Sequence, residues 1–175
     1  MDELELRNQL EKHHTAGFGW SLACCNRNPS EAEEVLQTVY VKILEGKARY
    51  KGKASFKTWL FSVIRLTAID FGRRKMLRQF KLICLNQSVP PFAAPGPDDL
   101  AYESQMQKKF AAALAALPNR QREVLELVFY HDFSLSEAAE VMNIYVGSAR
   151  THYERGKKKL REQLQESKLY EQSKR

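Results

Sequence analysis

Cysteine is scarce in this sequence. The three that occur are Cys24, Cys25 and Cys84, an odd number in which two are adjacent. This arrangement provides neither a disulfide framework nor the ligand spacing of a zinc site. The cysteines are therefore interpreted as small apolar fillers of a reduced, cytoplasmic protein, and we expect no metal and no cofactor.

Long apolar runs are missing as well. No stretch approaches the roughly 20 residues of a membrane span. The opening residues, MDELELRNQL, are acidic and amphipathic and do not resemble a signal peptide. We therefore expect no direct insertion into a membrane.

Catalytic signatures are also absent. The sequence has no glycine-rich loop that could cradle phosphate, and neither the Cys24–Cys25 pair nor any histidine has an evident catalytic partner. An enzyme is therefore the weakest of the alternatives, and the chain is predicted not to be one.

Positive charge is abundant. The 175 residues carry a formal net charge of +7 and have a pI near 9.3, which favours a polyanionic partner such as nucleic acid. A hydrophobic content of 43% supports a packed core.

In most of the chain, apolar residues recur at the spacing of an α-helix. In NPSEAEEVLQTVYVKIL, Ser30 and Glu33 have the spacing of a capping box, and apolar residues from Ala32 to Ile43 recur on one face. A second helix is expected to begin at Ser55 and to fray near Gly72 and the basic cluster that follows it.

Prolines interrupt this pattern once. Four of the six lie in NQSVPPFAAPGPDD, where they oppose helix and favour an extended linker. The sequence thus predicts an all-α fold of two small helical domains, residues 1–85 and 99–175, joined by a linker at 86–98.

The second predicted domain contains a helix-turn-helix pattern. Ser134 and Glu137 form a capping box, Ala138 and Ala139 allow a close helix approach, and Asn143 suits a left-handed turn. The helix that follows is expected to turn Val146, Ala149, Tyr153, Gly156 and Leu160 inward.

The opposite side of that helix is polar and basic, as a reader of DNA requires. The candidate DNA contacts are Ser148, Arg150, Thr151, His152, Arg155, Lys158 and Lys159, with Arg150 on the flank.

The first predicted domain is polarised. Eleven basic residues and one acid lie between Lys47 and Lys81, interleaved with the aromatic residues Tyr50, Phe56, Trp59 and Phe61. Cations and aromatic faces together suit single-stranded or melted nucleic acid. The acidic helix that precedes this block suits a protein partner.

Two stretches carry a family resemblance. EAEEVLQTVYVKIL followed by KGKASFKTWLFSVIRLTAIDFGRRK resembles regions 2.2 to 2.4 of sigma-70 family RNA polymerase sigma factors of the extracytoplasmic-function (ECF) group. LPNRQREVLELVFYHDFSLSEAAEVMNIYVGSARTHYERGKKKLREQL is similar to their region 4. The resemblance implies an alternative bacterial sigma factor that binds core RNA polymerase and directs promoter-specific transcription initiation.

The resemblance also implies partners and sites. The helix over residues 31–44 would dock on the coiled coil of the largest catalytic subunit, and other contacts would involve the flap of the second subunit and an anti-sigma factor. The matching docking positions are Glu31, Glu34, Gln37 and Thr38.

Promoter DNA would meet both domains. The helix over residues 146–159, with the contacts named above, would read the −35 element. The first domain would recognise and melt the −10 element, and its matching residues are Tyr50, Lys53, Phe56, Lys57, Arg65, Arg73 and Arg74.

Several positions depart from the family pattern. Thr38 stands where an acid is usual, and Leu66 stands where asparagine is usual. In the recognition helix, Ala149 is smaller than the usual hydrophobic residue, and His152 replaces a common arginine.

A helix-turn-helix activator of the response-regulator type is the alternative. Its recognition helix resembles SARTHYERGKKKL nearly as well. Such activators carry an α/β receiver or a ligand domain, whereas the first half of this chain shows no strand pattern.

Overall fold

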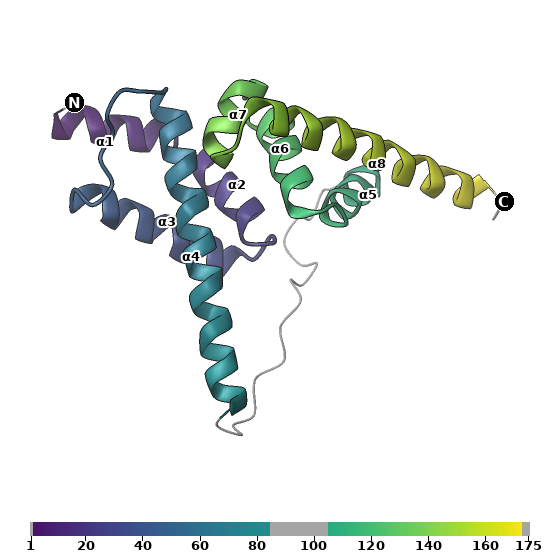
Figure 1. Ribbon diagram of the computed structural model, residues 1–175, viewed down its shortest axis with the longest axis horizontal. Coiled ribbons are helices and arrows are strands. Elements are labelled where there is room, and N and C mark those ends of the chain that lie inside the picture. The colour runs from purple at the N-terminus through teal and green to yellow at the C-terminus, as the bar shows by residue number, and fades with distance from the viewer. Residues whose placement is uncertain (1, 85–104, 173–175) are drawn as a thin grey trace. The chain divides into compact units, whose positions relative to one another are not determined.

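The chain folds into two separate helical units. The computed structural model describes residues 2–172 except 85–104, and every regular element in these ranges is an α-helix (Figure 1). The two compact units are Met1–Gly96 and Pro97–Arg175. The all-α prediction is therefore confirmed. The predicted linker, 86–98, lies outside the described residues, so the linker and its borders stay predictions.

The described part of the first unit, residues 2–84, contains four helices. They are α1 (Glu3–Lys12), α2 (His14–Cys24), α3 (Pro29–Leu44) and α4 (Phe56–Cys84). The last three pack against one another around Trp20, which is fully buried. The Trp20 indole stacks on the ring of Phe61 at 5.9 Å between centroids and donates a hydrogen bond of 3.0 Å to the Phe61 carbonyl oxygen. This bond satisfies the one polar atom of a large buried side chain.

Helix α3 begins two residues earlier than the predicted capping box. The side chain of Asn28 accepts a hydrogen bond from the backbone N–H of Glu31, and Pro29 occupies the first helical turn. Both features are typical of helix starts, because asparagine caps well and proline needs no donor there. The cap predicted at Ser30 is therefore wrong, although the apolar face predicted for this helix is buried.

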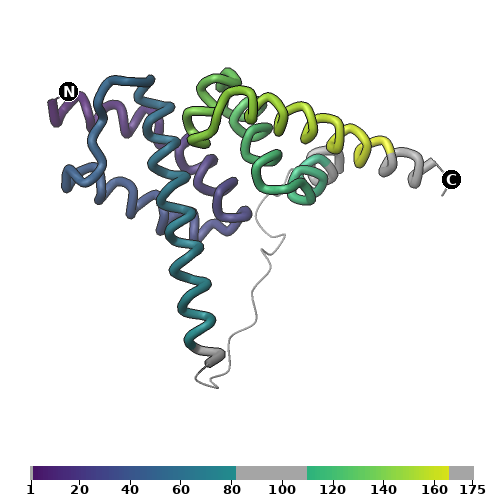
Figure 2. Tube along the Cα trace, viewed as in Figure 1, coloured from purple at the N-terminus to yellow at the C-terminus, as the bar shows by residue number. Residues whose placement is uncertain are grey.

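Helix α4 starts at the predicted place but continues further. The Ser55 hydroxyl accepts from the backbone N–H of Thr58, which caps the helix. The helix then passes Gly72 without a break, so the predicted fraying near Gly72 is wrong (Figure 2). Its bounds are Phe56–Cys84. A single glycine costs a helix only about 1 kcal/mol, and the residues after it, mostly Arg, Lys, Met, Leu and Gln, are good helix formers.

Residues 105–172, the described part of the second unit, also form four helices. They are α5 (Gln105–Ala115), α6 (Asn119–Tyr130), α7 (Leu135–Met142) and α8 (Val146–Gln172). A core of Leu114, Leu117, Leu125 and Leu160 joins α5, α6 and α8.

The capping box and the turn predicted for the helix-turn-helix are confirmed. The Ser134 hydroxyl accepts from the backbone N–H of Glu137, and the Glu137 carboxylate accepts from the backbone N–H of Ser134. Asn143 adopts a left-handed conformation, with φ of 52°, directly after α7. The cap and the turn fix where α7 ends and α8 begins.

At Gly156, α8 approaches α6 closely. A Cβ atom at this position would lie 3.0 Å from Leu125 Cδ1 and 3.1 Å from Gln121 Cβ. By contrast, a Cβ atom at Gly147, in the first turn of the same helix, would meet nothing within 4 Å.

We expect Gly156→Ala to destabilise the second unit. Overpacking against α6 should outweigh the gain in helix propensity and lower the local free energy of unfolding by about 1–2 kcal/mol. Native-state hydrogen exchange of the α6 and α8 amides measures this quantity for the second unit by itself. The matched control is Gly147→Ala, which should not lower it, and equal losses in both variants would contradict the packing argument.

Candidate functional site

The outer surface of α8 carries the predicted DNA contacts. Six of the seven are exposed, and His152 is half-buried. The exposed residues are Ser148, Arg150, Thr151, Arg155, Lys158 and Lys159. Because successive residues are about 100° apart around a helix, all except Arg150 fall within an arc of about 120°, and Arg150 lies about 140° from Arg155. The structure therefore groups six of the predicted residues and separates the seventh.

The start of α8 differs from the sequence prediction. Val146, predicted to face inward, is 43% exposed, and the preceding Tyr145 is 88% exposed. Ala149 is the first residue of α8 that is fully buried, and its small side chain lies where the helix meets its own unit. The prediction failed because Val146 has the spacing of the apolar stripe but lies in the first turn of α8, where its side chain does not reach the core.

An aromatic cluster lies where the loop before α4 meets the start of that helix. The rings of Tyr50, Phe56 and Trp59 lie 5.2 to 5.5 Å apart between centroids. The Tyr50 hydroxyl donates a 2.6 Å hydrogen bond to the Ala54 carbonyl oxygen, which closes the loop on itself. The lysines of this loop, Lys51 and Lys53, remain exposed.

Two of the predicted −10 residues are buried. Phe56 is 8% exposed within the aromatic cluster, and Arg65 is 6% exposed in the interior of the first unit. Lys57 is half-buried, and its Nζ atom lies 5.9 Å from the centroid of the Phe61 ring. Arg73 and Arg74 are exposed further along α4. A surface contact with DNA is therefore open to Lys53, Arg73 and Arg74 and closed to Phe56 and Arg65 in this conformation.

Two histidines, His13 and His14, lie where α1 gives way to α2, and the sequence shows no evident catalytic partner for either. The structure places His13 against the ring of Phe56, at 6.0 Å between centroids, and joins His14 Nδ1 to the Tyr40 hydroxyl at 2.9 Å. Burial and the nearby cations Lys12 and Lys57 lower the pKa of His13. No sequence pattern could have shown this, because Phe56 is 43 positions away in the chain.

The exposed side of α3 holds the predicted polymerase-docking residues. Glu34 and Gln37 are exposed, and Thr38 is half-buried. An open groove of about 380 Å³ runs beside them, and its lining comes from α2 and α3: His14, Phe18, Glu33, Leu36, Gln37 and Tyr40.

Glu31 differs from the other predicted docking residues. Its carboxylate lies 2.5 Å from Lys75 Nζ on α4 and 3.3 Å from Asn28 Nδ2, which donates to it. A second polar contact between the same helices joins Lys42 Nζ to Thr67 Oγ1 at 3.1 Å. Glu31 thus ties α3 to α4.

Cys25, directly after α2, is not a reactive thiol. Cys25 is buried, and burial together with the Glu31 carboxylate raises the pKa of its thiol to about 11, which keeps it protonated. Within the described part of the chain, no group of three His, Cys, Asp or Glu side chains could hold a metal ion. No helix there is long and apolar enough to cross a membrane.

Comparison with known proteins agrees with this geometry. Residues 14–78 match the model of sigma-70 region 2, and residues 107–160 match the model of sigma-70 region 4. The chain is 30% identical over 142 residues to the ECF RNA polymerase sigma factor SigX of Bacillus subtilis. This match covers 79% of this chain and 73% of SigX. It is 28% identical over 148 residues to the sigma factor CarQ of Myxococcus xanthus, covering 85% and 83% of the two chains.

The chain belongs to the ECF group of sigma-70 factors. This ECF sigma factor binds core RNA polymerase and promoter DNA and directs promoter-specific initiation, so the response-regulator alternative is wrong.

The fold agrees with two solved structures. A TM-score of 0.71 at 21% identity relates it to RpoE in a complex with the anti-sigma factor NepR from Bartonella quintana, over 92% of this chain and 97% of that one. A TM-score of 0.64 at 18% identity relates it to CnrH in a complex with the cytosolic domain of CnrY, over 94% and 90%.

We expect the first unit to lose stability in mild acid through His13. Because the folded state lowers the pKa of His13, the unfolded chain binds more protons below the ordinary value of 6.5. Stability is full above that value and falls as the pH drops through the folded pKa. Both tryptophans, Trp20 and Trp59, lie in this unit, so their fluorescence during urea unfolding reports on it alone. His13→Gln should flatten the loss between about pH 7 and pH 5; an unchanged pH dependence would contradict the assignment.

We expect Glu31 and Lys75 to be coupled in stability. A double-mutant cycle with Glu31→Gln and Lys75→Gln, followed by the same fluorescence, should give a coupling free energy of about 0.5–1 kcal/mol, since the pair is only partly shielded from solvent. Glu34→Gln, an equal change on the exposed side of α3, should alter the unfolding free energy by less than about 0.5 kcal/mol. Additive effects of the two substitutions would show that the ion pair does not hold the helices.

Proposed function

We propose that this sigma factor divides promoter recognition and polymerase binding among three separate surfaces. The observation that carries the proposal is the exposed arc of α8, which groups polar and basic side chains on the side opposite the buried Ala149, Gly156 and Leu160. A helix with one buried stripe and one donor-rich face, preceded by a capped helix and a tight turn, has the form of a major-groove reader.

The −35 element is read by the exposed arc of α8. Arg155 and Ser148 lie nearest its centre, and His152 lies at its edge. All three are of the types that bond to base edges, whereas Lys158 and Lys159 suit phosphates. The Thr151 hydroxyl donates to the Gly147 carbonyl oxygen at 3.0 Å, so toward DNA it acts as an acceptor or through its methyl group. Arg150, on the other flank, contacts the backbone of one strand.

The −10 element is bound and opened by the loop before α4 and by the exposed cations of α4. Lys53, Arg73 and Arg74 neutralise phosphates. Tyr50, which is half-buried in the aromatic cluster, offers part of its ring to an unpaired base. Phe56 and Arg65 are buried beneath this surface, so they hold its residues in place and do not contact DNA themselves.

Core polymerase binds the exposed side of α3. Glu34, Gln37 and Thr38 meet the coiled coil of the largest catalytic subunit, while Glu31 holds α3 against α4. The second unit meets the flap of the second subunit. Transcription initiation with this sigma factor takes place in the cytoplasm. An anti-sigma factor holds this protein inactive, as the complexes of RpoE with NepR and of CnrH with CnrY suggest by analogy.

We expect two arginines of α8 to have different effects on promoter binding. Arg155→Ala should weaken binding to DNA with the correct −35 sequence by about 1–3 kcal/mol and should reduce discrimination against a scrambled one. Arg150→Ala should weaken binding to both DNAs by similar amounts, because a phosphate contact carries no sequence information. Affinities of the reconstituted holoenzyme for the two DNAs provide the measurement. Equal losses on both DNAs for Arg155→Ala would rule out base reading by this side chain.

A further inference from the structure

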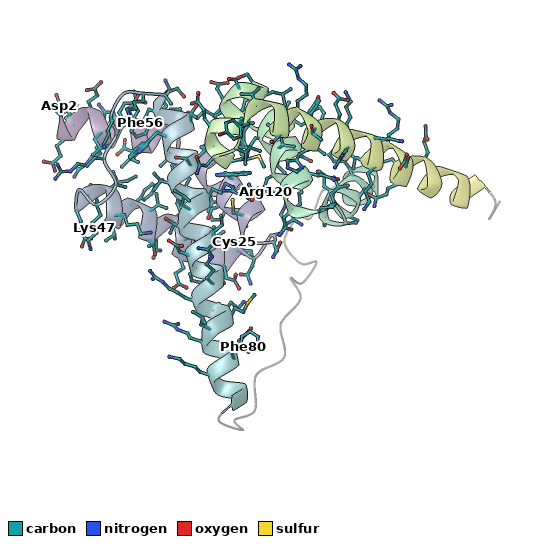
Figure 3. All side chains as sticks on the ribbon, in the orientation of Figure 1. Asp2, Cys25, Lys47, Phe56, Phe80 and Arg120 are labelled. Carbon is teal, nitrogen blue, oxygen red and sulfur yellow. The ribbon has the colours of Figure 1, made fainter. Side chains whose placement is uncertain are left out.

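One side of α4 carries large apolar side chains that remain exposed. Leu66 is 54% exposed, Met76 59%, Leu77 62% and Phe80 59%. Figure 3 shows Phe80 on the part of α4 that extends beyond the packing with α2 and α3. An isolated helical segment of this length is only marginally stable in water, so covering this side would also stabilise the helix.

These residues have the spacing of a helix–helix seam. Leu66, Ile69, Arg73, Met76 and Phe80 alternate at intervals of three and four residues, as the a and d positions of a heptad repeat do, and Leu77 lies beside them. We call this set of six residues the α4 stripe. Its length from Leu66 to Phe80 is about 21 Å, enough to seat about four turns of another helix.

Arg73 breaks the apolar stripe near its middle. Its side chain is 76% exposed, and its nearest carboxylate, that of Asp70 in the preceding turn, is 3.9 Å away. A partner helix laid on the stripe would enclose the guanidinium, and an enclosed cation is tolerated only when a carboxylate faces it. A polar residue at such a position therefore selects the partner and its register.

The position of Arg73 disfavours a second copy of this chain as the occupant. In a parallel pair, two Arg73 side chains would face each other. In an antiparallel pair, each would lie against Met76 of the other copy, with the second guanidinium about one turn away. Neither arrangement provides a carboxylate within the seam.

The chemistry also favours protein over nucleic acid on this side of α4. DNA requires cations, and the stripe holds only Arg73, whereas the exposed Arg74 and Arg78 lie outside it and the exposed Lys81 borders it. A row of large aliphatic and aromatic side chains at heptad spacing is instead what a second amphipathic helix covers.

We propose that the α4 stripe binds an amphipathic helix of a partner protein, which presents apolar side chains at heptad spacing and one acidic side chain against Arg73. Such a helix would cover Arg73 and keep it from DNA. This last consequence rests on the proposed function, whereas the binding itself does not.

The test uses the full chain and a synthetic helical peptide without DNA or polymerase. The peptide has leucine at its a and d positions except for one central glutamate, and a second peptide has lysine there. Fluorescence anisotropy should show saturable binding of the glutamate peptide at least about tenfold tighter than that of the lysine peptide. Leu77→Ala combined with Phe80→Ala should weaken binding by a similar factor, and Arg73→Glu should reverse the preference.

Arg78→Glu is the matched control, because it makes the same charge change on the opposite side of α4 and should leave the preference intact. The proposal is overturned if the two peptides bind alike, or if Arg78→Glu reverses the preference as Arg73→Glu does. It is also overturned if sedimentation shows a dimer that Leu77→Ala with Phe80→Ala dissolves. Loss of duplex binding in that double variant, with peptide binding unchanged, would assign the stripe to nucleic acid. Since no promoter enters the peptide assay, its failure leaves the proposed function untouched.

Discussion

The close approach of α8 to α6 at Gly156 determines which side of α8 is exposed. With no Cβ atom at this position, α8 lies against Leu125 and Gln121, and this contact turns Ala149 and Leu160 inward. Helical geometry then leaves the arc from Ser148 to Lys159 exposed. A donor-rich surface thus follows from packing on the other side of the same helix.

In the first unit, too, packing on one side of a helix leaves its other side exposed, although different contacts are responsible. Trp20 of α2 is fully buried, and its hydrogen bond to the Phe61 carbonyl oxygen fixes α2 on α4. The Glu31–Lys75 and Lys42–Thr67 contacts hold α3 on α4. These contacts leave the outer side of α3 exposed, and this is the side that we propose for polymerase. In each unit the proposed functional surface is therefore the side that the core does not use.

Local signals predicted some elements accurately and misplaced others. The capping box at Ser134 and the left-handed turn at Asn143 depend on a few neighbouring residues, and both are confirmed. Asn28 and Ser30 are both good caps, and only the backbone of the structure decides between them. The burial of Arg65 and the contact of His13 with Phe56 depend on residues far apart in sequence, so periodicity could not show them. The docking, −10 and −35 residues remain assignments by resemblance and surface exposure.

Mapping the 5′ ends of transcripts made in vitro tests the central claim most directly. Core RNA polymerase, with and without this protein, would transcribe fragmented genomic DNA of the source bacterium, and sequencing would locate the starts. The account predicts discrete starts that require the protein and share one sequence block near −10 and another near −35. Starts identical to those of core polymerase alone, or starts without a shared pair of blocks, would contradict it.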